Sequence, residues 1–422
     1  MLEISSIASI LLLVGFAMLA GLLMTRIMGK MGLPDVTSYL VIGLIVGPCV
    51  LGKLGVGFTT FESVEQLGII SDVALGFIAF SIGNEFRLSA LKQTGKQATV
   101  IAIAQALFTT LVVDVVLVAA YYIFNLKDSV GIETCITLGA IATATAPAAT
   151  LMVVNQYKAK GPLTSLLLPI VALDDAVGLM VFAVSFGIAK AINSGAQLDV
   201  ITVVVNPLIE VFASLILGAV VGYIFSMTVK LFQSRRNRLC LSIAFVVLAV
   251  AIAKMKFFVP GTEIEIGFSN LLVCMMLGTI FCNVCSFSAG VMEHVDRWTA
   301  PLFVLFFVLS GAELDVSVFA QGTVVLVGVL YIISRSLGKY FGAGISAKAV
   351  KCSPDVCKYL GITLLPQAGV ALGMSVTAAH ELGSAGALIR NIVLFAVLIY
   401  ELVGPMLTKM SLIKAGEITP KN

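Results

Sequence analysis

Long apolar segments recur along the whole chain, and they constrain its fold more than any other feature. A helix that crosses a membrane needs about 20 mainly apolar residues. The sequence therefore predicts an all-α polytopic membrane protein, in which residues 1–422 form a single transmembrane domain without a soluble regulatory domain. Thirteen such segments, separated by polar turns, lie at approximately 6–28, 36–52, 63–84, 98–124, 131–155, 163–190, 202–229, 239–257, 267–289, 299–318, 322–346, 357–379 and 386–410.

The composition agrees with a lipid environment. Hydrophobic residues make up 59 % of the chain and charged residues 12 %. A soluble domain carries about 25 % charged residues, so this chain cannot cover its surface with polar groups. We expect membrane lipid as its surroundings and no nucleic-acid partner. The first apolar segment is followed by Arg26 and Lys30 instead of a small-residue cleavage site, so we expect it to remain as a membrane helix.

Lysine and arginine are distributed unevenly between the two sets of connecting loops. With an outside N-terminus, the inside loops hold about 18 of these residues and the outside loops about 6. The distribution predicts a cell (inner) membrane protein whose N-terminus lies outside and whose C-terminus lies in the cytoplasm.

Two of the predicted segments, 131–155 and 357–379, carry a proline in a polar stretch. A proline inside a helix removes a backbone hydrogen bond, and a membrane tolerates this only where protein or a water-filled cavity satisfies the backbone. Transporters built from inverted repeats have such a pair of broken helices at the transport site. The alternative is an ordinary kink in each helix. The residues that mark the two breaks are Thr143, Thr145 and Pro147 in the first, and Pro366, Gln367 and Gly369 in the second.

Two adjacent carboxyl groups, Asp174 and Asp175, lie in the middle of the predicted segment 163–190. Charges at this depth are costly and indicate function by default. Burial and a negative neighbour both disfavour the charged form of a carboxyl group, so a proton competes with a metal ion for it. Na⁺ and Li⁺ are hard cations that prefer oxygen ligands, as Ca²⁺ and Mg²⁺ do. The pair therefore predicts a site for either Na⁺ or H⁺; the alternative is a structural pair bonded to serines or backbone.

Four further charged residues lie inside the predicted segments. Asp114 and Arg335 stand in segments that are seven apart, and we expect them to pair with each other or to neutralise the half-helix dipoles at the two breaks. Lys339, one turn after Arg335, is expected nearer the cytoplasmic end, where it can snorkel. Glu401 is expected to hydrogen-bond near the second break or to snorkel in the inner half. We interpret the charges of all four residues as structural support for the site.

Several of these segments resemble the bacterial cation:proton antiporters of the Kef/NapA type and, more distantly, NhaA. The similarity covers essentially the whole membrane region. It is carried by GLPDVTSYLVIGLIVGP (32–48), LGFIAFSIGNEF (75–86), GAIATATAPAATLMVV (139–154), LDDAVGLMV (173–181), VLFFVLSGAELDVS (304–317) and RSLGKYFGA (335–343).

The resemblance implies a 13-helix inverted repeat with two crossed discontinuous helices. Core helices, at about 98–190 and 322–410, would move like an elevator against a panel at about 6–84 and 239–318 that forms a homodimer. Asp175 would be the ion-binding acid and Asp174 its partner, so that both hold Na⁺, while the stretch with Thr143 and Thr145 would offer oxygen ligands. In many electrogenic relatives a lysine takes the place we assign to Arg335, and arginine does not readily release a proton.

These features predict a secondary antiporter that exchanges Na⁺, Li⁺ or K⁺ for H⁺ and serves pH homeostasis, without a cofactor. The alternative is a Na⁺-coupled symporter of an organic anion, which needs a roomier cavity with a polar or cationic lining. We do not expect an enzyme, because the sequence has neither a Gly-x-Ser-x-Gly elbow nor a His-Glu-x-x-His motif.

Overall fold

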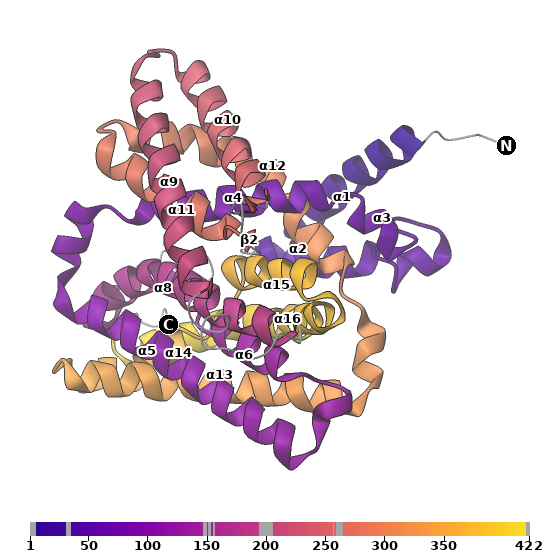
Figure 1. The fold of residues 1–422 in the computed structure, drawn as a ribbon. Helices are drawn as coiled ribbons and strands as arrows, with labels where there is room; N and C mark the ends of the chain where they lie inside the picture. Colours follow the sequence, from indigo (N-terminus) through magenta and orange to yellow (C-terminus); the bar gives the residue numbers. More distant parts are fainter. Residues whose placement is uncertain are drawn as a thin grey trace.

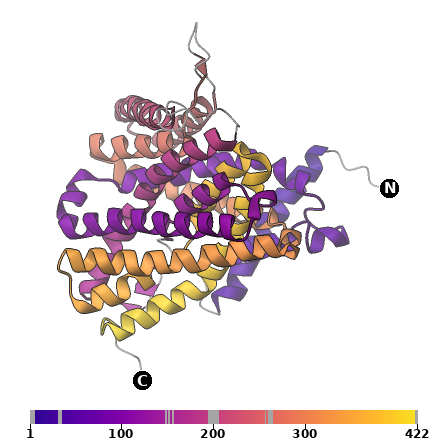
Figure 2. The ribbon, with the colours of Figure 1, turned by 60° about the horizontal axis from the view of Figure 1, so that its bottom comes forward.

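The chain folds into a bundle of helices that cross one another at many angles (Figures 1 and 2). The computed structural model describes residues 6–30, 35–146, 150, 153–154, 157–193, 206–255, 257–258 and 265–418. Short 3₁₀ helices and one antiparallel pairing of two-residue strands accompany the α-helices in this part of the chain.

The helices before the middle of the chain are α1 (Ser6–Gly29), α2 (Asp35–Val46), η1 (Leu51–Leu54), α3 (Phe61–Glu65), α4 (Gly68–Glu85), α5 (Leu88–Ile123), η2 (Leu126–Asp128), α6 (Ile132–Ile141), α8 (Pro162–Asn193) and α9 (Asn206–Lys230). They are followed by α10 (Arg235–Ala253), β1 (Phe257–Phe258), β2 (Glu265–Ile266), α11 (Asn270–Val284), α12 (Ser288–Ala312), η4 (Val316–Ala320), α13 (Gly322–Ala349), α14 (Pro354–Thr363), α15 (Gly369–Glu381) and α16 (Gly383–Lys414).

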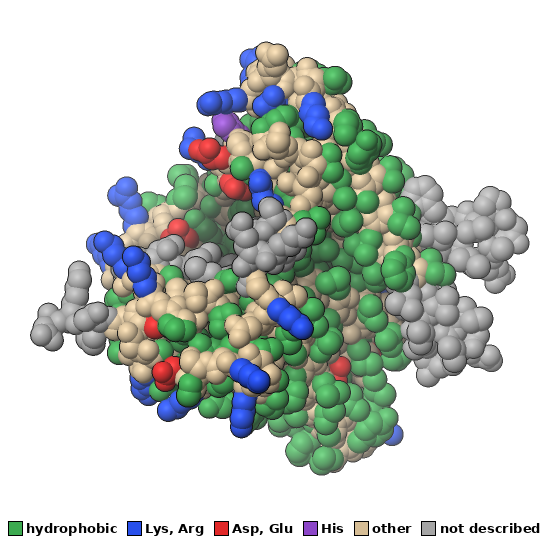
Figure 3. Space-filling view, turned by 90° about the vertical axis from the view of Figure 1, so that its left-hand side faces the viewer, with side chains coloured by type: hydrophobic (Ala, Val, Ile, Leu, Met, Phe, Trp, Pro, Cys, Tyr) green, Lys and Arg blue, Asp and Glu red, His purple; other side chains and the backbone are tan. Residues whose placement is uncertain are grey.

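The helices agree with the prediction of a polytopic membrane protein. Nine of those in the described residues are long and apolar enough to cross a membrane, and three shorter ones are also apolar. Each of the thirteen predicted segments overlaps at least one helix. Large hydrophobic side chains lie exposed on the outer surface, among them Leu11, Leu19, Leu111, Ile216, Ile345 and Met406. Figure 3 shows one face, on which basic side chains gather near the top and the left edge and hydrophobic ones cover the lower right.

The bounds of α12 differ from the prediction. We expected a segment at 299–318, whereas the helix begins at Ser288 and ends at Ala312. Its first turns are amphipathic and carry an ion pair between Glu293 and Arg297 at helical spacing. Such a pair stabilises a helix in water, and an apolar window does not detect it. α5 likewise begins ten residues before the predicted 98–124, and Gly95, with a φ of +81°, interrupts its first turns.

Helix pairs far apart in the sequence pack side by side. α5 runs along α13, which both views of the ribbon show, and α2 packs against α12 and α1. α16 packs against α15, α14 and α13, and it also touches α2.

Glycines allow two of these pairs to approach through their backbones. A Cβ atom on Gly83 of α4 would overlap the carbonyl of Met275 in α11, and one on Gly278 of α11 would overlap the carbonyl of Phe80. The same reciprocal arrangement joins α2 and α12 through Gly43 and Gly311, each against a carbonyl of the other helix. Small residues at such interfaces are how membrane helices pack without a hydrophobic driving force.

We predict that Gly278→Leu lowers the thermal unfolding temperature in detergent, because the new side chain would overlap the backbone of Phe80 and separate α4 from α11. A membrane-facing glycine provides the control: Gly15 is exposed and has no atom within 4 Å of an added Cβ. Equal unfolding temperatures for Gly278→Leu and Gly15→Leu would contradict the packing argument.

Candidate ion-binding site

Two chain interruptions meet inside the bundle. α14 ends at Thr363 and α15 begins at Gly369, and residues 364–368 between them are not helical. α6 ends at Ile141, and residues 144–146 after it also leave the helix. The backbone N–H of Ala146 donates a hydrogen bond of 2.8 Å to the carbonyl of Pro366, so the two interruptions are bonded to each other. Pro147, the predicted mark of the first break, lies outside the described residues.

Arg335 of α13 holds carbonyl groups from both interruptions. Its guanidinium donates to the carbonyls of Ala142 at 3.0 Å, Ala144 at 2.7 Å and Leu365 at 2.7 Å, and the side chain is 0 % exposed. These carbonyls follow the C-terminal ends of α6 and α14, where the helix dipole is negative. The planar fork of arginine suits this task because it presents several donors at fixed angles.

The structure distinguishes the two roles expected of Arg335, which were pairing with Asp114 or neutralising the half-helix dipoles at the breaks. No ion pair between Asp114 and Arg335 is present among the described residues, so the predicted pairing is wrong. Asp114 instead lies against Gly139 of α6, where an added Cβ would overlap its carboxyl group. The physical reason is that backbone carbonyls in the interrupted helices lack helical partners and occupy the guanidinium donors.

Gln367 and Tyr331 complete the bonds around the second interruption. The amide of Gln367 donates to the carbonyl of Ile141 at 3.0 Å and also meets the hydroxyl of Tyr331. Both side chains are buried at 0 % exposure. Gly404 of α16 lies against Pro366, where an added Cβ would stand 2.8 Å from the proline ring. The sequence prediction included Gln367 but missed Tyr331, whose apolar neighbours suggested ordinary packing.

Asp174 is the centre of a buried polar cluster beside the two interruptions. Its carboxylate is 0 % exposed and forms an ion pair of 2.7 Å with Nζ of Lys339. It also accepts hydrogen bonds from the amide of Gln105 in α5 and the hydroxyl of Thr145. Sequence reasoning missed Gln105, since nothing in α5 alone shows that it faces α8.

Lys339 corrects the sequence analysis. We expected it to snorkel toward the cytoplasmic end, but it is 0 % exposed and bound to Asp174. Its ammonium also donates to the carbonyl of Thr143 and, at 3.0 Å, to the hydroxyl of Thr145. Four residues along a helix advance about 6 Å on the same face, so Lys339 follows Arg335 into the interior. A lysine is thus present at the site, one turn after Arg335 on α13.

Asp175 and the two threonines lie in the same region. Asp175 is 4 % exposed and directly follows Asp174 on α8. Thr143 donates its hydroxyl to the carbonyl of Ala140 at 2.7 Å, while its own carbonyl accepts from Lys339. Thr145 links the interruptions further, because its hydroxyl lies 3.2 Å from the carbonyl of Leu364. Carboxylate, hydroxyl and carbonyl oxygens therefore converge where α8 passes the two interruptions.

Comparison with known proteins identifies the family of the chain. A model of the family described as sodium/hydrogen exchanger, transmembrane, matches residues 14–414. The chain belongs to this family. It is similar to the K⁺/H⁺ antiporter subunit KhtU of Bacillus subtilis, with 23 % identity over 94 % of this chain and 92 % of that protein. It is also similar to the Na⁺/H⁺ antiporter NhaS4 of Synechocystis, with 23 % identity over 84 % of each chain.

A solved structure has the same fold as this sodium/hydrogen exchanger family member. The sodium proton antiporter MjNhaP1 of Methanocaldococcus jannaschii superposes with a TM-score of 0.72 at 20 % identity. The match covers 97 % of this chain and 99 % of that one. At this identity the likeness concerns the fold alone.

Glu401 of this exchanger family member faces α2. The expected snorkelling is wrong, because the side chain is 1 % exposed, and one carboxyl oxygen lies 3.4 Å from the hydroxyl of Thr37 in α2. The helix position explains this orientation: Tyr400 faces α13, where its hydroxyl donates to the carbonyl of Ile332 at 2.7 Å. The next residue is turned by about 100° toward α2.

Glu417, which sequence reasoning missed, caps the helix that carries the two aspartates. Its carboxylate accepts from the backbone N–H groups of Leu163 at 2.5 Å and Thr164 at 2.8 Å, and from the hydroxyl of Thr164 at 2.7 Å. A carboxylate at a helix N-terminus satisfies free N–H groups and complements the dipole. Pro162 at the first position signals where α8 begins, but no local pattern shows that the cap comes from the end of the chain.

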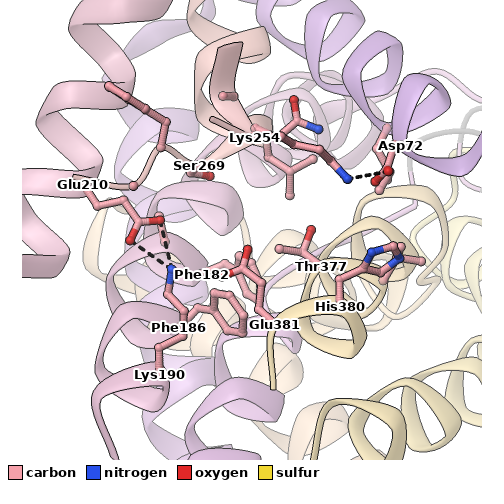
Figure 4. Close-up of a pocket in the computed structure, with 18 of the residues that line it drawn as sticks. Asp72, Phe182, Phe186, Lys190, Glu210, Lys254, Ser269, Thr377, His380 and Glu381 are labelled. Atoms are coloured by element: carbon pink, nitrogen blue, oxygen red, sulfur yellow. Dashed lines mark hydrogen bonds and ion pairs between the residues drawn. The ribbon is translucent and has the colours of Figure 1, made fainter. Parts of the chain in front are cut away.

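A cavity of about 560 Å³ opens beside the far end of α8 (Figure 4). Lys190 there pairs with Glu210 of α9 and Glu381 of α15, both at 3.0 Å, and Lys254 pairs with Asp72. Phe182 lines the cavity and stands seven residues after Asp175, on the same face of α8. A polar opening thus lies about two helical turns from the buried aspartates.

We predict that Arg335→Lys lowers the thermal unfolding temperature, because one ammonium group cannot reach carbonyls of both interruptions. Each lost hydrogen bond to a charged donor costs about 1.5–3 kcal/mol. Arg297→Lys is the control, since the Arg297 side chain is 74 % exposed and pairs with Glu293 on its own helix. An unchanged unfolding temperature in Arg335→Lys would refute the proposed bracing by the guanidinium.

We predict that Lys339→Met destabilises the protein by about 3–5 kcal/mol, because it leaves the buried charge of Asp174 without its partner. Adding Asp174→Asn to Lys339→Met is expected to restore most of the loss. Unfolding temperatures of the single and double variants, measured in the same detergent, test this coupling. A double variant no more stable than Lys339→Met would show that the two residues do not compensate each other.

Proposed function

We propose that this protein is a secondary antiporter that exchanges a monovalent cation, Na⁺, Li⁺ or K⁺, for H⁺ across the cell membrane by alternating access. The observation that carries the proposal is the buried pair Asp174 and Asp175 beside two interrupted helices, with Lys339 bound to Asp174. Buried carboxylates in a membrane protein are costly and are kept where they carry ions or protons.

The exchange step follows from competition for oxygen atoms. Asp175 takes up either the cation or a proton, and the nearby hydroxyl and carbonyl oxygens of Thr145 and Thr143 offer further hard ligands. A cation that approaches Asp174 competes with the ammonium of Lys339 for the same carboxylate. Lysine, unlike arginine, can release its proton in a buried site. We therefore propose that Lys339 and Asp175 both release protons when the cation binds.

The finer architecture belongs to the same proposal. We propose thirteen membrane-spanning segments in an inverted repeat, with the interrupted segments 131–155 and 357–379 crossing at the site, as in the Kef/NapA type. A core of α5, α6, α8 and α13–α16 would move like an elevator against a scaffold of α1, α2, α4 and α10–α12. The hydrogen bond between Ala146 and Pro366 supports the crossing, because it joins breaks that are seven segments apart.

Orientation and assembly are also proposed. The excess of basic residues in alternate loops supports an N-terminus outside and a C-terminus in the cytoplasm. We propose a homodimer formed by scaffold helices, by analogy with the family. An organic-anion symporter has less support, because the cations nearest the breaks are already occupied: Arg335 by backbone carbonyls and Lys339 by Asp174.

We predict that purified wild-type protein in proteoliposomes dissipates an imposed pH gradient when Na⁺, Li⁺ or K⁺ is added, and that Asp175→Asn abolishes the response. The amide can neither take up a proton nor balance the charge of the ion. Asp355→Asn, at an exposed position in the first turn of α14, is the matched control and is expected to keep the activity.

One relative is named a K⁺/H⁺ antiporter and another a Na⁺/H⁺ antiporter, so parallel assays with each cation are necessary. Full activity in Asp175→Asn would disprove the role of this carboxylate. A wild type that responds to no cation would overturn the antiporter proposal, and a Na⁺-coupled symporter of organic anions would then be tested.

A further inference from the structure

Glu401 of α16 is a buried carboxyl group that takes no part in the exchange step proposed above. It is 1 % exposed. One of its oxygens lies 3.4 Å from the hydroxyl of Thr37. The other has no hydrogen-bond partner within the described part of the chain. Buried polar atoms without a partner are rare in folded proteins, and each calls for a functional or structural explanation.

The surroundings of Glu401 place it between two groups of helices. Thr37 belongs to α2, which packs against α1 and α12. Glu401 belongs to α16, which packs against α13, α14 and α15. α2 and α16 are in contact. Glu401 therefore lies where the proposed core meets the proposed scaffold, at the boundary across which an elevator motion must occur.

Among the described residues, Glu401 has no salt bridge, and its one hydrogen bond is the one from Thr37. The guanidinium of Arg335 lies 4.4 Å from the ring centroid of Tyr400, the residue before Glu401, but it donates to three carbonyls at the breaks. The helices that pack here carry other titratable groups, among them Asp35 and Tyr39 on α2, Glu133 on α6, Lys339 on α13, Asp355 on α14 and His380 on α15. None of these forms a hydrogen bond or ion pair with Glu401 in the described part of the chain.

A carboxylate in this setting would be an uncompensated charge inside a membrane protein. Such a charge costs several kcal/mol, and the group avoids the cost by binding a proton. One neutral hydroxyl at 3.4 Å is a weak hydrogen bond and does not offset it. The arrangement with α16 against α2 therefore suits the protonated acid, whereas separation of the two helices would admit water and suit the carboxylate.

We propose that Glu401 is a second proton-binding site, protonated while α16 lies against α2 and deprotonated when the two helices separate. The reaction is a simple proton transfer, in which the carboxylate and a proton from water form the neutral acid and the reverse step returns the proton to water. This inference rests on the proposed exchange function, and it adds a residue through which pH would control the motion of the core.

A second buried atom on the same helix face supports a polar route to this site. The hydroxyl of Thr408 is 0 % exposed and has no hydrogen-bond partner among the described residues. It lies seven residues after Glu401, which places it on the same face about two turns nearer the end of α16. Ser411, 3 % exposed, continues this polar face toward the end of the helix. Protons would reach Glu401 from that end.

Infrared difference spectroscopy tests the protonation directly and without transport. The full chain in proteoliposomes is compared at acid and alkaline pH. In the wild type, the carbonyl-stretch region is expected to show buried carboxylic acids that are lost on titration. The component that Glu401 contributes is expected to be missing in Glu401→Gln, whereas the component of Asp175 remains. Glu293→Gln, whose side chain is 60 % exposed, is the control and is expected to keep the band. A wild-type spectrum from which Glu401→Gln removes nothing would overturn the proposal.

The transport assay supplies the second test. Glu401→Gln stays neutral at every pH, so its cation-dependent proton exchange is expected to fall about threefold or more at alkaline pH, with KM for the cation unchanged. Glu401→Asp, which can still titrate, is expected to recover the rate. A pH profile of Glu401→Gln that superposes on the wild type would refute the proposal. If the wild type itself exchanges nothing, the proposed function fails, and the infrared test still decides the protonation of Glu401.

Discussion

The three hydrogen bonds from Arg335 to backbone carbonyls are the interaction on which the rest of the site depends. Two helices are interrupted inside the bundle, and each interruption leaves carbonyl groups that no helical N–H can satisfy. Without a donor these groups would be buried and unpaired, at a cost comparable to a lost hydrogen bond each. One guanidinium serves carbonyls from both interruptions, so it fixes the two stretches relative to each other as well as satisfying them.

The residue one turn along α13 then has a different task. Lys339 occupies the same helix face as Arg335, but its ammonium meets Asp174 of α8 as well as oxygens of the first interruption. The two cations divide the work according to their chemistry. Arginine keeps its charge and can act as a permanent brace, whereas lysine can exchange its proton when its partner changes. In the proposed exchange, Arg335 would keep the two interruptions together while Lys339 releases its proton.

The sequence predicted the individual residues of this site better than the contacts between them. Asp174, Asp175 and the second interruption are readable from one segment each, because an acid or a proline within an apolar run is conspicuous. The pairings were not readable, since Lys339, Gln105 and Glu417 each meet residues from distant segments. Their contacts depend on how each helix is oriented about its own axis. Hydrophobic periodicity does not reveal this orientation when a helix is apolar on nearly every face. The expected pair of Asp114 and Arg335 failed for the same reason: opposite charge in counterpart helices does not determine which groups face each other.

The reciprocal glycines between α4 and α11, and between α2 and α12, have a mechanical consequence. Where backbone meets backbone, no side chain can change rotamer to let one helix slide past the other, and each carbonyl sits in the space left by a missing Cβ. Such contacts resist the sliding of one helix along the other. Compliance in the molecule must therefore lie at boundaries filled by side chains, and the thin contact between α2 and α16 is one of these. Helices joined by such contacts form a rigid group, against which another group of helices can move.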